Sequence, residues 1–89
     1  MSPKKFHYVY VLQSHKDNQF YTGYTNDLRR RIIEHQQGSV RSTVHRLPVT
    51  LVYYEACLSQ ADATKREKYL KTAWGKRYIK GRIAAYLTG

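Results

Sequence analysis

Acidic residues and cysteine are both scarce in this 89-residue sequence. Only 6 Asp and Glu stand against 16 Lys and Arg, which gives a formal net charge of +10 and a sequence pI near 10.0. Such an excess of positive charge favours a polyanionic partner. The single cysteine, Cys57, excludes an internal disulfide and agrees with a reducing compartment. Its simplest interpretation is a small apolar residue near the end of a strand.

Several signatures of membrane proteins and enzymes are missing as well. The longest apolar runs are only a few residues, and no signal-like apolar segment follows the first residues, so we expect a cytoplasmic protein. The four histidines are scattered, without paired cysteines or an HExxH motif, which argues against zinc but leaves an ion with oxygen ligands open. Gly-rich phosphate loops, GxSxG motifs and internal repeats are also absent.

Three segments have the pattern of β-strands. Residues 6–13 are β-branched, aromatic or apolar at nearly every position, which predicts a central strand buried on both faces. A polar turn over 14–19 leads into a second strand over 20–24, so the two strands form a β-hairpin. A third strand is expected over 49–57, and with 42% hydrophobic residues the whole length fits one domain over 1–89.

Helices are expected around this sheet, in the order β-β-α-β-α-α. The first runs over about 27–37, with Thr25 or Asn26 as its cap and with Leu28, Ile32 and Ile33 toward the core. Residues 38–48 read as a surface loop. The remaining helices are expected from Ser59 to about Trp74, ending at Gly75, and over about 76–87, where a basic tail helix follows the core at about 7–75.

Glu67 occupies a helix position where an apolar residue is expected. Ala63, Glu67, Leu70 and Trp74 follow the i, i+4, i+7, i+11 spacing of the stripe that packs on the sheet. A buried carboxylate is protonated, paired with a cation or bound to a metal. Helix geometry alone leaves two interpretations open, a salt bridge to an arginine of the first helix and a metal site. The basic residues that flank Glu67 favour a metal site over a direct contact between this carboxylate and an anionic substrate.

Tyrosines and arginines concentrate around the hairpin. Tyr21 and Gly23 share one face of the second strand. Core packing explains most of the nine tyrosines, but a phenol beside a phosphate can also hold or deprotonate an attacking water. Gly23 fits either a bulge or a close backbone approach by a ligand. Of the three consecutive arginines at 29–31, Arg31 lies on the same helical row as His35, whereas a solvated face accounts for the others.

Taken together, these residues resemble the GIY-YIG nuclease superfamily, in particular its small stand-alone members. The resemblance rests on Tyr8-Val9-Tyr10, ten intervening residues, Tyr21-Thr22-Gly23, Arg31 eight positions later, His35 four further on, and Glu67 on a later helix. It departs from the family pattern at Tyr8, which replaces the first glycine, and at Thr22, which replaces the isoleucine.

This resemblance implies an α+β fold with a three-stranded, largely antiparallel sheet flanked by helices, and a site that cleaves phosphodiester bonds. It implies catalytic roles for Tyr10, Tyr21, Arg31, His35 and Glu67, with Glu67 holding Mg²⁺ or Mn²⁺. Either tyrosine is a candidate general base. The expected partner is nucleic acid, DNA in the first place, with no membrane association. The expected nucleic-acid-binding residues are Gly23, Arg29, Arg30, Arg41, Arg46 and Lys71.

The leading hypothesis is a metal-dependent DNA endonuclease, structure-selective or nonspecific, acting on branched or damaged DNA as in DNA repair. A nucleic-acid-binding module with a weak or partner-dependent nuclease site is the alternative, favoured because no asparagine follows Glu67. Composition alone also allows a basic protein of membrane surfaces or ribosomes without catalytic function.

Overall fold

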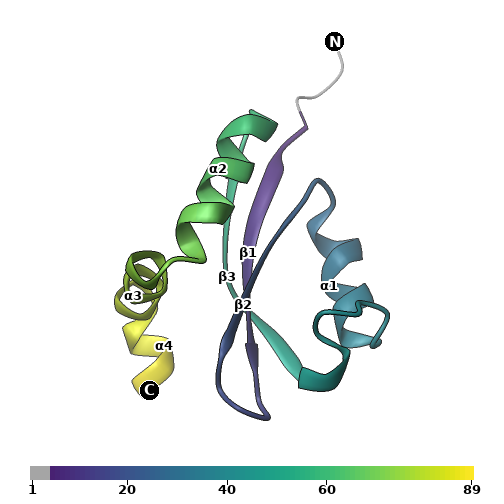
Figure 1. Cartoon of the computed structure of the whole chain (residues 1–89), viewed down its shortest axis with the longest axis vertical. Coiled ribbons are helices and arrows are strands. Elements are labelled where there is room, and N and C mark those ends of the chain that lie inside the picture. Colours follow the sequence, from purple (N-terminus) through teal and green to yellow (C-terminus); the bar gives the residue numbers. More distant parts are fainter. Residues whose placement is uncertain (1–4) are drawn as a thin grey trace.

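Strand β1 (His7–Ser14) is the central strand of a three-stranded sheet in the order β2-β1-β3. The computed structural model describes residues 5–89 and is shown in Figure 1. Both neighbours of β1 are antiparallel to it. The other elements are β2 (Phe20–Thr25), α1 (Leu28–Gln36), a short 3₁₀ helix η1 (Val44–Arg46), β3 (Val49–Cys57), α2 (Gln60–Leu70), α3 (Ala73–Arg82) and α4 (Ala84–Thr88). The predicted α+β architecture is confirmed.

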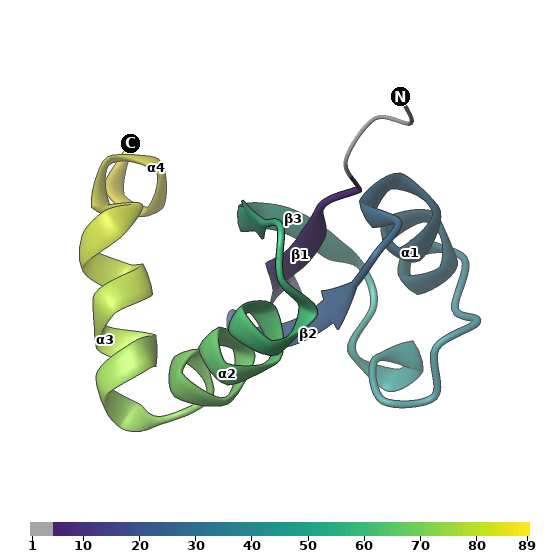
Figure 2. The same cartoon turned by 90° about the horizontal axis from the view of Figure 1, so that it is seen from above.

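The sheet separates two layers of helices. Figures 1 and 2 show α1 on one face of the sheet and α2 and α3 on the other. Val9 and Val11 point toward α2 and α3 and are fully buried there. Tyr10 and Leu12 point to the opposite face, where the α1 side chains lie. Both faces of β1 are therefore covered, as the run of consecutive apolar residues in its sequence predicted.

The first helix is capped by a different residue from the two that its sequence suggested. The side chain of Asp27, not of Thr25 or Asn26, accepts a hydrogen bond from the Arg30 backbone nitrogen at 3.2 Å and caps α1. The prediction for Ile33 was also wrong, because this residue is 45% exposed. The apolar face that α1 turns toward the sheet is therefore narrower than its sequence suggested, because it lacks Ile33.

The boundary between the second and third helices was predicted wrongly. Helix α2 ends at Leu70 instead of near Trp74, and Thr72 caps α3 by accepting a hydrogen bond from the Gly75 nitrogen at 3.1 Å. Gly75 lies inside α3, where its bare backbone packs against the last turn of α2. The chain turns before Trp74, so this side chain leaves the predicted stripe and is 69% exposed.

A partly buried ion pair joins this helical layer to the sheet. The guanidinium of Arg66 donates to both carboxylate oxygens of Glu55 on β3, with its shortest bond at 2.9 Å. The Tyr53 hydroxyl donates to the same carboxylate, and burial raises the pKa of this tyrosine. Arg66 also lies 4.9 Å from the ring centroid of Tyr78, so α2, α3 and β3 meet at one cation.

The segment between α1 and β3 is less exposed than we expected from the surface loop predicted over 38–48. Val40 and Thr43 are buried in it. Its end is tied to β1, because the Ser14 hydroxyl donates to the Arg46 carbonyl oxygen at 2.6 Å. Within residues 5–89, no helix is long and apolar enough to cross a bilayer.

Candidate active site

Tyr10 lies across Gly23 on the α1 face of the sheet. The two residues are partners in the antiparallel register of β1 and β2. A Cβ atom at position 23 would lie 2.5 Å from Cζ of Tyr10 and nearer still to its hydroxyl oxygen. Only glycine therefore leaves room for the phenol. The sequence suggested a bulge or a close approach by a ligand at Gly23, whereas the structure has an unbroken β1–β2 register here and places the Tyr10 side chain against this residue.

His35 connects this phenol to the loop after α1. Its Nε2 lies 2.8 Å from the Tyr10 hydroxyl oxygen and its Nδ1 lies 2.7 Å from Oγ1 of Thr43. The imidazole is completely buried, and this burial, followed by the nearby charge of Arg31, lowers the pKa of His35 to about 4. His35 is therefore neutral at physiological pH and carries one ring proton.

Two buried hydroxyls satisfy the ring nitrogens of His35. Thr43 is fully buried and its hydroxyl bonds to Nδ1, while the buried Tyr10 hydroxyl bonds to Nε2. A neutral imidazole has one donor and one acceptor nitrogen, so one of these hydroxyls donates to the ring and the other accepts from it. Neither ring nitrogen is left without a partner in the interior.

Tyr21 completes an aromatic cluster with these two residues. Its ring centroid lies 5.3 Å from that of His35 and 6.5 Å from that of Tyr10. The Tyr21 hydroxyl accepts a hydrogen bond from Oγ of Ser42 at 3.2 Å. Tyr10 is buried, and this burial raises the pKa of its hydroxyl, whereas Tyr21 is only partly buried. The two phenols therefore differ in their access to water.

Arg31 is the cation nearest to this cluster. Its charge opposes the effect of burial on the pKa of Tyr10 and adds to the effect of burial on the pKa of His35. The guanidinium is held by Glu34 one turn later, at 3.1 Å. In return, Arg31 lowers the pKa of the Glu34 carboxyl, which is therefore ionised at neutral pH. Arg31 and Glu34 line an open pocket together with Tyr24, Thr25, Asn26, Asp27, Arg30 and Gln60.

Glu67 lies on α2, with its side chain only 20% exposed. Its charge is the smallest of the influences on the pKa of Tyr10, which it raises. Of the two interpretations that its sequence position left open, the salt bridge is present, but its partner is not an arginine of the first helix. Glu67 pairs instead with Lys71, one turn later on the same helix, at 3.0 Å.

Comparison with known proteins gives the family. Residues 6–83 match the family described as the GIY-YIG catalytic domain. The chain belongs to the GIY-YIG family. A UPF0213 protein of Staphylococcus saprophyticus is 40% identical over 75 residues, covering 83% of this chain and 90% of the relative. One from Streptococcus pyogenes serotype M5 is 40% identical over 88 residues, covering 98% and 89%.

A solved structure of the same group supports the fold of this GIY-YIG domain. The solution NMR structure of a UPF0213 protein from Bacillus halodurans is 37% identical and covers 85% of this chain and 83% of its own, with a TM-score of 0.54. The family places the chain in a nuclease superfamily, whose substrates are nucleic acids and whose members generally use a divalent metal ion. The family match extends beyond the predicted core at about 7–75 and includes α3.

The acidic groups of this GIY-YIG domain fit a hydrated hard cation. Among residues 5–89, no three His, Cys, Asp or Glu side chains are grouped as metal ligands. The resemblance gives the role of metal ligand to Glu67 alone. Mg²⁺ suits such a site because it is commonly bound through one or two carboxylates, while waters and substrate phosphates supply the other ligands. The Lys71 ammonium is 55% exposed and has room to move away from the carboxylate.

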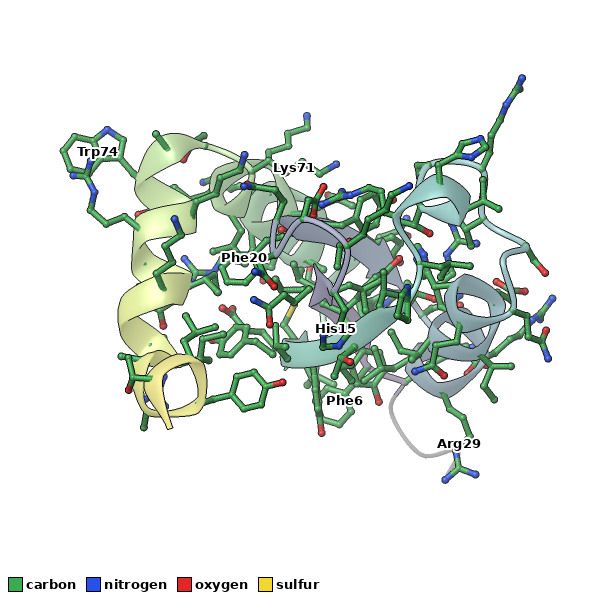
Figure 3. The ribbon with its side chains drawn as sticks, turned by 90° about the horizontal axis from the view of Figure 1, so that it is seen from below. Phe6, His15, Phe20, Arg29, Lys71 and Trp74 are labelled. Carbon is green, nitrogen blue, oxygen red and sulfur yellow. The ribbon has the colours of Figure 1, made fainter. Side chains whose placement is uncertain are left out.

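The basic residues expected to bind nucleic acid differ in their exposure. Arg29 and Arg41 are exposed, and Arg30 is 73% exposed at its side chain while it pairs with Glu34. Arg46 is more enclosed, and it donates to the Phe20 carbonyl oxygen at 3.4 Å. Figure 3 shows Arg29 on the opposite side of the molecule from Lys71.

The sequence did not reveal three side chains that form hydrogen bonds to the predicted site residues. Thr43 holds His35, Ser42 donates to Tyr21, and Glu34 holds Arg31. The segment that contains Ser42 and Thr43 has no periodicity, so its sequence gives no sign of which side chains turn inward. Glu34 also pairs with Arg30, at 3.4 Å.

Proposed function

We propose that this protein is a metal-dependent endonuclease that hydrolyses DNA phosphodiester bonds, with structure-selective or nonspecific cleavage. The observation that carries this proposal is the convergence of Tyr10, Tyr21 and His35 beside the Arg31 guanidinium. These residues come from two strands and one helix, and they combine proton-transfer groups with a cation. Hydrolysis of a phosphodiester requires both.

The difference between the two tyrosines assigns their roles in this proposal. Tyr10 is buried with a raised pKa, so its hydroxyl stays protonated and serves the site through its hydrogen bond to His35. Tyr21 is reachable by water and is the general base that holds and deprotonates the attacking water. His35 remains neutral and positions Tyr10 through Nε2. Arg31 stabilises the negative charge that develops on the phosphorane.

Glu67 is the proposed ligand of the divalent ion. Mg²⁺ bound there would supply charge stabilisation for the leaving 3′ oxygen. Lys71 balances the Glu67 carboxylate in the absence of substrate. When a phosphate enters, the Lys71 ammonium turns from the carboxylate to this new anion, which frees Glu67.

A nucleic-acid-binding module with a weak nuclease site is the second candidate. The observation that favours it is the 3.0 Å ion pair between Glu67 and Lys71, which competes with metal binding. The two candidates differ in what Glu67 contributes. A nuclease needs this carboxylate for cleavage, whereas a binding module does not need it at all.

A nicking assay separates these candidates. Supercoiled and branched DNA are incubated with Mg²⁺ or Mn²⁺ and with the intact chain, Glu67→Gln or Asp62→Asn. Asp62 is an exposed acid in the first turn of the same helix, so Asp62→Asn changes the net charge equally. We expect Glu67→Gln and EDTA to abolish nicking while Asp62→Asn cleaves normally. Equal cleavage by Glu67→Gln would refute the role of Glu67, and DNA binding without any nicking would favour the binding module.

A further inference from the structure

Trp74 is the most exposed large apolar side chain in the part of the chain that the structure describes. It is the only tryptophan of the sequence, lies in the first turn of α3 and is 69% exposed. Figure 3 shows its indole projecting outward at one end of the molecule. This side chain therefore contributes little to the core, and its large aromatic surface is available to a partner.

A cation lies beside the indole. The Arg77 guanidinium lies 4.9 Å from the centroid of the Trp74 ring, one turn along α3. The exposed area shows that most of the ring surface still faces solvent. An exposed ring with a cation beside it offers a base a surface for stacking and its phosphate a positive charge.

All charged residues that follow Glu67 in the sequence, on both sides of Trp74, are basic. No acidic residue follows Glu67, whereas residues 68–89 contain six basic ones. These are Lys68, Lys71, Lys76, Arg77, Lys80 and Arg82. Basic side chains interleaved with an exposed aromatic ring are the combination that binds single-stranded nucleic acid, where the cations follow the backbone and the ring stacks on a base.

The position of Trp74 links it to the candidate active site. Glu67, the proposed metal ligand, pairs with Lys71, and Trp74 follows three residues later across the turn between α2 and α3. Figure 3 shows Lys71 and Trp74 on the same side of the molecule. A strand that places a phosphate at Glu67 would thus pass Lys71 on its way to the indole.

We propose that Trp74 is a stacking platform for an unpaired base of the nucleic acid, with Lys71 and Arg77 binding the neighbouring phosphates. The proposal rests on the proposed nuclease function for the identity of the polyanion. It adds a substrate class, because a base inside an intact duplex has no free face to offer. The preferred substrate therefore carries unpaired bases beside the cleaved bond, as at a flap or a branch.

Fluorescence of the single tryptophan tests this proposal directly. Glu67→Gln protein in EDTA is titrated with a 20-nucleotide single strand and with a blunt hairpin duplex of matched length, so that no cleavage interferes. We expect the single strand to quench the Trp74 emission and the duplex to leave it nearly unchanged. Quenching of equal size by both, or by neither, would overturn the proposal.

Variants measure the contribution of stacking to affinity. With fluorescently labelled DNA, we expect Trp74→Ala to weaken single-strand binding about tenfold, or about 1.4 kcal/mol, and duplex binding less than about twofold. Trp74→Phe retains an aromatic face and is expected to stay within about threefold of the intact chain. Tyr86→Ala removes another exposed aromatic ring, from α4, and serves as the matched control. Unchanged single-strand affinity in Trp74→Ala would contradict the platform.

A membrane surface is the competing partner for an exposed indole among basic side chains. Tryptophan with lysine is typical of helices that lie on membrane surfaces, so the titration is repeated with phosphatidylglycerol vesicles. A blue-shifted Trp74 emission with vesicles, and no response to single strands, would overturn the nucleic acid assignment. Quenching without any cleavage by the intact chain refutes the nuclease proposal alone. Cleavage without quenching refutes the Trp74 proposal alone.

Discussion

The Tyr10 hydroxyl oxygen lies 2.8 Å from Nε2 of His35, although 25 residues separate them in the sequence. This bond joins the central strand to the first helix on the face where Tyr21 and Arg31 also lie. The imidazole is uncharged at neutral pH, because burial and then the nearby charge of Arg31 lower its pKa to about 4. The protonation of His35 therefore links the integrity of the cluster to pH.

We expect acid to destabilise the fold through His35. Its pKa is about 4 in the folded protein against about 6.5 in the unfolded chain, so the unfolded state binds an extra proton between these values. Neutral, buried His35 therefore contributes about 3 kcal/mol to the free energy of unfolding. This contribution is fully present above pH 6.5 and is lost as the pH falls toward 4. Urea unfolding between pH 4 and 7 measures it.

His35→Gln should remove most of this pH dependence, because glutamine does not titrate. His45→Gln is the matched control, since His45 is exposed and its side chain makes no hydrogen bond within residues 5–89. If the free energy of unfolding of the intact chain were constant between pH 4 and 7, His35 would not be buried in its neutral form.

Thr43→Val is expected to destabilise the protein by about 1–3 kcal/mol. The substitution keeps the shape but leaves Nδ1 of His35 without the hydroxyl that lies 2.7 Å from it. Thr43→Ser retains the hydroxyl and should restore most of the bond, at the cost of one buried methyl group. Thermal unfolding of both variants decides between these outcomes. Equal stability of Thr43→Val and Thr43→Ser would show that this bond does not hold the imidazole.

The elements were predictable from sequence wherever a local pattern carried the information. The continuous apolar run of β1 arises because Val9 and Tyr10 lie on opposite, equally covered faces. The resemblance to the GIY-YIG superfamily likewise indicated Tyr10 and His35, which the structure brings together. The end of α2 was not predictable in this way, because Gly75 acts through its contact with a preceding turn that the sequence does not reveal.

The supporting residues of the candidate site were not predictable for a related reason. Thr43 lies in an aperiodic segment, and its inward direction depends on the backbone path of the whole loop. The cation that pairs with Glu67 was not predictable from helix spacing. The spacing gives the direction of the Glu67 side chain, but it does not show which neighbouring side chains are long enough to reach the carboxylate. Lys71 is long enough to reach back one turn, and it satisfies the carboxylate locally.

The two tyrosines should respond differently to loss of their hydroxyl groups. Under the proposed mechanism, Tyr21→Phe removes the general base and should reduce cleavage by about 100-fold or more. Tyr10→Phe removes the buried hydroxyl that bonds to His35 and should reduce cleavage by about tenfold through loss of positioning, with little change in the pH–rate profile. The comparison is made on one plasmid substrate from pH 6 to 9. A larger loss in Tyr10→Phe would reverse the assigned roles.

Two glycines of α3 should respond in opposite directions to alanine. A Cβ atom at Gly75 would collide with the Tyr69 carbonyl oxygen and Leu70 Cα, so Gly75→Ala must separate α3 from α2 and cost about 1–3 kcal/mol. A Cβ atom at Gly81 meets nothing within 4 Å, so Gly81→Ala should stabilise the protein by about 0.5–1 kcal/mol through helix propensity alone. Urea unfolding of the two variants gives both signs in one experiment. Equal effects would contradict the close packing at Gly75, on which the turn before Trp74, and hence the exposure of its indole, depends.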